Sequence, residues 1–194
     1  VHTGDSLVVT EEAGFVLRGW SALHDSSATQ TFSASHSTQV GTQFLTSYCI
    51  LKDNVPGTNG VLRAYSAYTN TWSSLALPSV PNTSLTWGLN AAVQKEGLNY
   101  HAYSAYTGQW VTLTTTVAGG FPISGVDYVA TALRFNNGGA FQYAAFSAPR
   151  GVWTLSPNYP STGGSGVQAI PNCSVLAIKV PDPAPNSFRY AAYS

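Results

Sequence analysis

Five serines recur in one short phrase, and a serine hydroxyl is the nucleophile of many hydrolases. Each serine follows an aromatic residue that itself follows a small one: Gly19-Trp20-Ser21, Ala64-Tyr65-Ser66, Ala102-Tyr103-Ser104, Ala145-Phe146-Ser147 and Ala192-Tyr193-Ser194. No Gly-x-Ser-x-Gly elbow surrounds any of them. Because five equivalent serines indicate a structural role, we predict that none of them is catalytic.

Histidines and carboxylates could bind metals, but their spacing does not favour it. The four histidines (His2, His24, His36 and His101) lack the spacing of a zinc site, and the eight acidic residues form no calcium loop. We therefore predict no metal and no cofactor. A hydrolase that uses a pair of carboxylates brought together by the fold, as glycoside hydrolases do, stays open as an alternative.

Aromatic residues are the more informative group. Trp72, Trp110 and Trp153 each follow a repeat aromatic by seven positions, so we expect them to pack between repeat units. Trp87 breaks this pattern and could form an exposed platform, because aromatic rings stack on the C–H faces of sugars. Arg18, Arg63 and His101 occupy equivalent positions two before the aromatic; they either line a pocket or are ordinary solvated residues.

Composition excludes some partners. Charged residues make up 8% of the 194 residues and the formal net charge is zero. A nucleic-acid partner is not expected, because phosphate binding needs clustered Lys and Arg. No apolar run is long enough to suggest a membrane span. Low charge and abundant Ser, Thr and Asn favour a secreted or cell-surface protein. Cys49 and Cys173 are either a disulfide or two buried thiols.

The phrase of a small residue, an aromatic and a serine recurs about every 40 residues, a period that is typical of propeller blades. The aromatics Trp20, Tyr65, Tyr103, Phe146 and Tyr193 are separated by 45, 38, 43 and 47 residues. Each unit begins with a strand, a Gly/Asn turn and the strand that carries the aromatic. A tight turn and a strand that opens with Trp follow. Each unit is therefore a meander of at least three strands. We expect one domain, 1–194, with units near 1–38, 39–80, 81–118, 119–160 and 161–194.

One face of each aromatic strand pairs a bulky residue with a tiny one, such as Leu62 with Ala64 or Tyr100 with Ala102. This pairing suits close packing of one sheet on another. The N-terminal segment, Val1 to Asp5, resembles the strand that the fifth unit lacks. We therefore predict an all-β, small propeller of about five short antiparallel blades, closed by pairing of the N- and C-terminal segments.

The segment Tyr65-Ser66-Ala67-Tyr68-Thr69-Asn70-Thr71-Trp72 resembles the kelch repeat of β-propellers, in which an aromatic and a Trp flank a turn. The resemblance covers three units well and two in part. It implies blades around an axis with loops at both ends. Kelch repeats carry a Gly-Gly doublet at the end of a strand before the aromatic, and only Gly138-Gly139 resembles it. No residue of the copper-radical enzyme branch maps onto this chain.

These patterns favour a non-catalytic, lectin-like module that binds carbohydrate, with Trp87, Arg18, Arg63 and His101 as candidate ligand-binding residues. Two alternatives stay open. The first is a structural or protein-interaction module that self-associates as a homo-oligomer, and the second is a propeller-type hydrolase.

Overall fold

The computed structural model describes residues 2–3, 6–33, 36–37, 47–77, 84–116, 121–122, 130–160, 170–172, 175–181 and 188–193. Within these ranges every regular element is a β-strand, and the paired strands run antiparallel. The prediction of an all-β chain is confirmed. Among the same residues, no helix has the length and apolar character that crossing a membrane requires.

The strands pair in chain order into small sheets, each a meander. The first contains β1 (His2–Thr3), β2 (Leu7–Glu12), β3 (Val16–Ser21) and β4 (Ser26–Thr31). The second contains β5 (His36–Ser37), β6 (Tyr48–Asp53), β7 (Val61–Ser66) and β8 (Thr71–Ala76). The third contains β9 (Ser84–Trp87), β10 (Ala91–Glu96), β11 (Asn99–Ser104) and β12 (Gln109–Thr114).

Two further sheets follow in the C-terminal part. The fourth contains β13 (Phe121–Pro122), β14 (Ala130–Asn137), β15 (Ala140–Ser147), β16 (Val152–Leu155) and β17 (Tyr159–Pro160), with β17 paired to β15. The fifth contains β18 (Ile170–Asn172), β19 (Val175–Pro181) and β20 (Phe188–Tyr193). The repeat aromatic lies on the third strand of each of the first four sheets, and on β20 in the fifth.

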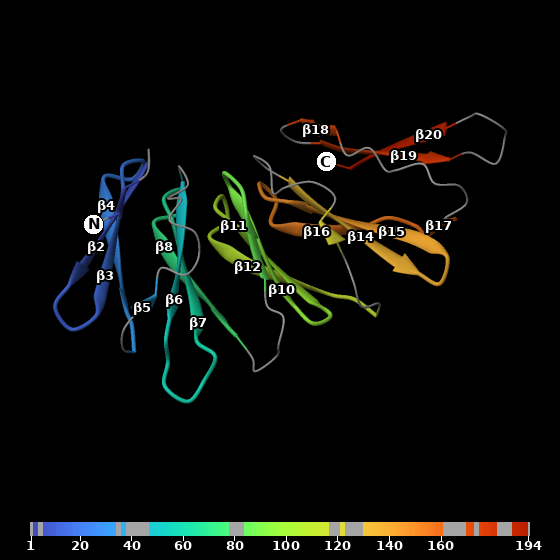
Figure 1. The fold of residues 1–194 in the computed structure, drawn as a ribbon. Helices are drawn as coiled ribbons and strands as arrows, with labels where there is room; N and C mark the ends of the chain where they lie inside the picture. Colours follow the sequence, from blue (N-terminus) through green and yellow to red (C-terminus); the bar gives the residue numbers. More distant parts are fainter. Residues whose placement is uncertain are drawn as a thin grey trace.

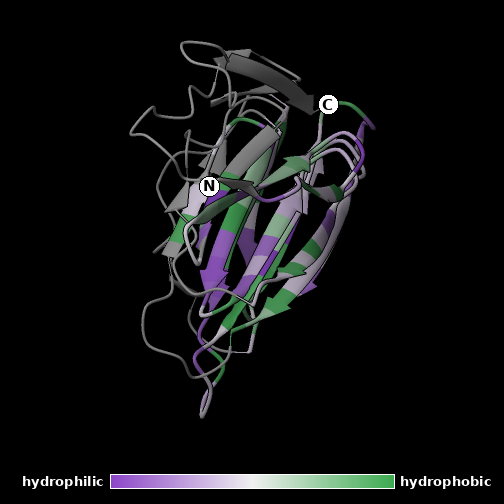
Figure 2. Ribbon diagram, turned by 90° about the vertical axis from the view of Figure 1, so that its right-hand side faces the viewer, coloured by the Kyte–Doolittle hydropathy of each residue, from purple (hydrophilic) through white to green (hydrophobic). Residues whose placement is uncertain are grey.

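The first four sheets lie side by side in chain order, and the fifth lies over the fourth (Figure 1). Hydrophobic and hydrophilic residues alternate along many strands, which appear banded in Figure 2. Such alternation gives each strand two different faces. In the second and third sheets both faces are buried, so these sheets lie inside the row.

Neighbouring sheets interlock through the small and aromatic residues of the repeated phrase. Tyr65 of β7 packs against Gly19 of β3, where an added Cβ atom would lie 2.7 Å from the ring. Tyr103 joins Ala64 in the next hydrophobic cluster, and Phe146 joins Ala102 in the one after that. The small residue of each sheet therefore faces the aromatic of the following sheet, and the predicted sheet-on-sheet packing is confirmed.

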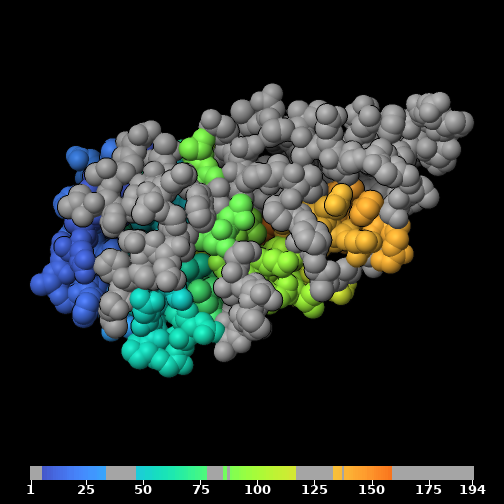
Figure 3. Space-filling view, viewed as in Figure 1, coloured from blue at the N-terminus to red at the C-terminus, as the bar shows by residue number. Residues whose placement is uncertain are grey.

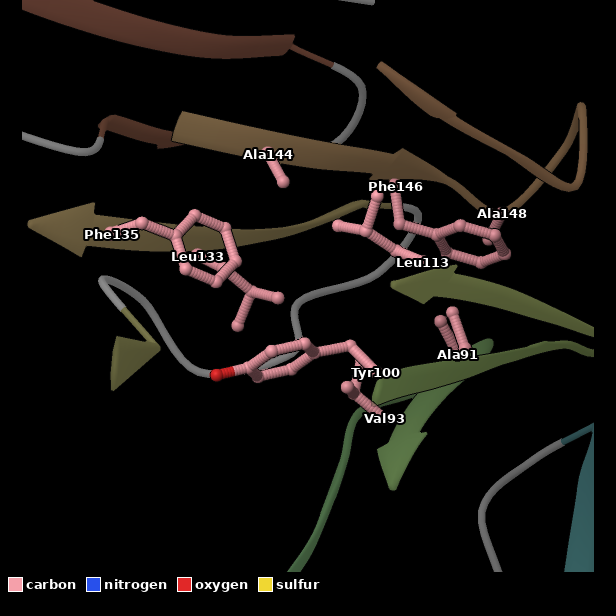
Figure 4. Packing of buried hydrophobic residues seen from close by; sticks show 10 residues of the cluster. Ala91, Val93, Tyr100, Leu113, Leu133, Phe135, Ala144, Phe146 and Ala148 are labelled. Carbon is pink, nitrogen blue, oxygen red and sulfur yellow. The ribbon is translucent and has the colours of Figure 1, made fainter. Parts of the chain in front are cut away.

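The cluster between the third and fourth sheets shows this packing at close range (Figure 4). Tyr100 and Phe135 meet edge to face, with ring centroids 5.4 Å apart. The same cluster contains Phe146 and Leu113, together with the small residues Ala91 and Ala148. Removing such side chains from water provides much of the free energy that holds the sheets together.

The repeated serines join the sheets by hydrogen bonds. The Ser21 hydroxyl donates to the Ala67 carbonyl at 2.6 Å, and the same bond links Ser66 to Ala105 and Ser104 to Ala148. Each serine oxygen also accepts a backbone N–H from the turn that follows it, from His24, Thr69 and Thr107 respectively. Ser21, Ser66 and Ser104 therefore each link two sheets and fix the turn that follows them.

The repeated tryptophans also cross between sheets. Trp72 Nε1 donates to the carbonyl of Ala28, and Trp153 Nε1 donates to that of Val111, both at 3.0 Å. Each Trp ring also lies against the aromatic of its own sheet, with centroids 5.1–5.2 Å apart in the three copies. Trp110 is partly buried against the cluster between the second and third sheets, although its Nε1 makes no hydrogen bond among the described residues.

Closure of the row into a ring is not found among the described residues. His2–Thr3 pairs with Val8–Val9 of the first sheet, and β20 pairs with β19. The short N-terminal strand thus completes its own sheet instead of the fifth one. In Figure 1 the first and fifth sheets occupy different ends of the arrangement.

Candidate ligand-binding face of the first sheet

Trp20 is exposed, whereas the equivalent aromatics of the next three sheets are buried. The side chain of Trp20 is 46% exposed, and Tyr65, Tyr103 and Phe146 are 0% exposed. The reason is its position in the row. Each of the other three packs against a preceding sheet, but β3 belongs to the first sheet, which forms one end of the space-filling view (Figure 3).

The residues around Trp20 form what we call the outer face of the first sheet, which comprises Val8, Thr10, Glu12, Arg18, Trp20, Ser27 and Thr29. Trp20 lies opposite Val8 and Ser27, and Arg18 lies opposite Thr10 and Thr29. The matching positions of the second sheet hold Cys49 with Trp72 and Leu51 with Ser74. The outer face therefore carries Ser27 and Thr10 at the positions where the second sheet has Trp72 and Leu51.

Arg18 and Glu12 form an ion pair beside Trp20. Arg18 Nε lies 2.5 Å from Glu12 Oε1, and Nη2 lies 3.3 Å from Oε2, while Nη1 donates to Ser27 Oγ at 3.3 Å. The hydrogen bonds and charge of Arg18 lower the pKa of Glu12, and Glu12 raises the pKa of Arg18. The guanidinium carbon lies 5.7 Å from the centroid of the Trp20 ring. A charge pair, an aromatic ring and several hydroxyls thus meet at one place.

Arg63 lies at the position equivalent to Arg18 but between two sheets. Its guanidinium contacts Asp53, with Nη2 2.9 Å from Oδ2, and Nη1 donates to Ser74 at 2.7 Å. Asp53 is fully buried and also accepts the backbone N–H of Ser33. Arg63 therefore neutralises a buried carboxylate.

His101, the third member of this series, is also buried and paired. Its Nε2 lies 3.1 Å from Glu96 Oε2, and its Nδ1 lies 2.8 Å from the hydroxyl of the exposed Thr112. A hydroxyl, an imidazole and a carboxylate that contact one another in this order resemble a catalytic triad. The second sheet, however, repeats the arrangement as Ser74, Arg63 and Asp53, and arginine cannot serve as a general base. The repetition favours a structural role for both sets. Arg18 and Glu12 are the equivalent pair of the first sheet, and of the three pairs theirs is the most exposed.

The structure thus does not join the four predicted ligand-binding residues in one site. Arg18 lies on the outer face, while Arg63 and His101 lie on the faces that pack against the first and second sheets. The backbone of Trp87 pairs with Ala92 in β9, and the Trp87 side chain lies outside the described residues.

Two further predictions concern cysteines and metals. Cys49 is a buried free thiol, and burial raises its pKa to about 12, while Cys173 lies outside the described residues. Among the described residues, no group of three or more His, Cys, Asp or Glu side chains is placed to hold a metal ion.

Sequence reasoning assigned Trp20 only a structural role and did not select Glu12. One signal was present in the sequence. The first repeat has Ser27 where the next three have Trp, which distinguishes this unit from the others.

No family model matches the chain, and no curated protein matches it.

Proposed function

We propose that this protein is a non-catalytic module that binds carbohydrate on the outer face of its first sheet. The exposure of Trp20 carries the proposal, because the same position is buried in each of the next three sheets. Indole rings stack on the C–H faces of sugars, and an aromatic ring with a few polar groups around it is typical of ligand sites.

The surroundings of Trp20 support this proposal over a purely protective role. A face that no other described sheet covers needs a polar surface for solubility, and Thr10, Ser27 and Thr29 provide one. Solubility alone does not require the largest aromatic residue at the centre of that surface. The ion pair and the hydroxyls supply donors and acceptors that sugar hydroxyls can bond to.

The arrangement of the sheets supports a propeller-like array, which we propose as the setting of the site. Four-stranded meanders pack face to face in chain order, as propeller blades do. Ring closure over the first sheet would cover Trp20, so a ligand on the outer face requires an array that stays open there. Export to the cell surface or the medium, where free glycans occur, is part of the same proposal.

Self-association is the second candidate, and it also rests on one observation. Ala67, Ala105 and Ala148 are buried and accept a serine hydroxyl from the preceding sheet, whereas the equivalent Ala22 is exposed. A further sheet from a second copy could therefore dock at Ala22 and Trp20. Among the described residues, the hydrolase alternative has no comparable supporting arrangement.

A glycan array distinguishes the two candidates. We expect wild-type protein to bind a subset of glycans, Trp20→Ala to lose that binding, and Leu23→Ala to keep it. Leu23 is a suitable control because it is 54% exposed but lies in the turn after β3. Trp87→Ala tests the tryptophan that the sequence singled out. Absence of binding to a broad panel, together with a dimer in light scattering that Trp20→Ala dissociates, would replace the carbohydrate proposal by self-association.

A further inference from the structure

The ion pair between Glu12 and Arg18 affects which carbohydrates the outer face can bind. Arginine recognises carboxylates best through a bidentate fork of two parallel N–H···O bonds. In this structure the fork of Arg18 is occupied, because Nε and Nη2 both contact the carboxylate of Glu12. The third guanidinium nitrogen, Nη1, contacts Ser27 Oγ.

An acidic sugar would have to compete with Glu12 for this fork. Glu12 is held on a neighbouring strand, and its side chain is 42% exposed, so its charge is presented to any ligand that approaches. A uronic acid beside Trp20 would meet a carboxylate of the same sign without an available arginine fork. Like charges in such a position raise the free energy of the complex.

A neutral sugar fits the same pair without displacing it. A guanidinium has five N–H donors, and the three bonds described above leave donors for a ligand hydroxyl. The carboxylate oxygens have lone pairs that accept from a second hydroxyl. The guanidinium carbon of Arg18 lies over the Trp20 ring, 5.7 Å from its centroid, so a sugar that contacts the exposed part of the indole also lies beside the ion pair.

We propose that Glu12 is a specificity-determining residue that restricts the outer face to neutral saccharides and excludes acidic ones. The inference rests on the proposed carbohydrate-binding function and deepens it. Arg18 and Glu12 occupy the repeat positions of Arg63 and Asp53, so the pair itself belongs to the repeat. Its exposure in the first sheet is what makes it available to a ligand.

Glu11 provides a matched control for Glu12. The two residues are adjacent on β2, carry the same charge and are both exposed. Successive side chains of a strand point to opposite faces, so Glu11 is directed away from the outer face. Glu12→Gln and Glu11→Gln therefore change the net charge equally but only the first frees the fork of Arg18.

Isothermal titration with neutral cello- and manno-oligosaccharides and with an acidic oligogalacturonate tests the inference. For wild-type protein we expect the neutral ligands to bind at least about tenfold more tightly than the acidic one, because a like-charge contact with Glu12 opposes the latter. Glu12→Gln should shift this ratio by about tenfold toward the acidic ligand, in a salt-sensitive manner, and Glu11→Gln should leave it unchanged.

The possible failures are distinguishable. Tighter binding of oligogalacturonate by wild-type protein, or an unchanged ratio in Glu12→Gln, would overturn the role of Glu12 while the carbohydrate proposal stands. Failure of every saccharide to bind would overturn both. Circular dichroism and thermal unfolding of each variant establish that it is folded, so that a lost affinity is attributed to the site.

Discussion

Ser21 donates its hydroxyl hydrogen to the carbonyl of Ala67, and this 2.6 Å bond joins the first sheet to the second. The bond recurs at each of the next two junctions, one repeat further along the chain. Because the donor and the acceptor belong to the same repeated phrase, the second and third sheets each donate to the next sheet and accept from the one before. The phrase is therefore the element that builds the row.

Replacing one of these serines should destabilise the protein. Ser66→Ala leaves the buried carbonyl of Ala105 without its donor and removes an acceptor for the N–H groups of Tyr68 and Thr69. We expect a loss of about 1–3 kcal/mol in the free energy of unfolding, measured by urea denaturation. Ser73→Ala is the control, because among the described residues the buried Ser73 hydroxyl makes no hydrogen bond. An equal loss in both variants would contradict the structural role of Ser66.

Two equivalent tyrosines should respond in opposite ways to loss of their hydroxyl. Tyr65 donates to Asn70 Oδ1 at 2.8 Å, so Tyr65→Phe should cost about 1 kcal/mol. The Tyr103 hydroxyl is buried near Ser66 and Ser73 but makes no hydrogen bond of good geometry among the described residues. Tyr103→Phe should therefore be neutral or stabilising, as Phe146 at the next repeat suggests. Thermal unfolding of the two variants measures the difference.

Alkaline pH should unfold the protein through its buried tyrosines. Burial raises the pKa values of Tyr48 and Tyr103 far above the usual 10.0. Above pH 10 the unfolded chain loses these protons while the folded protein keeps them, so the free energy of unfolding falls as pH rises. Each such tyrosine contributes a slope of about 1.4 kcal/mol per pH unit. Tyrosinate absorbance should rise together with unfolding, and Tyr103→Phe should reduce the slope. Ionisation of both tyrosines in protein that stays folded would contradict this.

The Cys49 thiol should be inert in the folded protein. Its pKa of about 12 leaves almost no thiolate near neutral pH, and the side chain is 4% exposed. We expect alkylation of Cys49 by iodoacetamide only in denaturant, with the modified peptide identified by mass spectrometry. Rapid alkylation under native conditions would show that the first and second sheets separate readily.

The repeat and its strands were predictable because they depend on local pattern. The alternation around Tyr65 and the seven-residue step to Trp72 fix which side chains share a face, and the structure confirms both. The serine bond was predictable only as a structural role, because its acceptor, the carbonyl of an alanine in the next repeat, becomes visible only when the sheets are stacked.

The candidate site was less predictable because it depends on where a unit lies in the row. Trp20 and Tyr65 occupy the same position in the repeat, and only the presence or absence of a preceding sheet makes one exposed and the other buried. The pairing of Arg18 with Glu12 depends on hairpin register, which places residues six apart in sequence beside each other. The predicted pairing of the chain ends rested on a short resemblance, and His2–Thr3 instead pairs locally with β2.

Titration of labelled protein with a neutral oligosaccharide, followed through the indole N–H signals in two-dimensional NMR spectra, tests the central claim most directly. The signal assigned to Trp20 by a Trp20→Phe variant should shift, because its ring is exposed on the outer face. The signals of Trp72 and Trp153 should stay in place, because their N–H groups are hydrogen-bonded between sheets. If Trp20 does not shift with any saccharide of a broad panel, or if only another tryptophan shifts, the outer face of the first sheet is not the binding site.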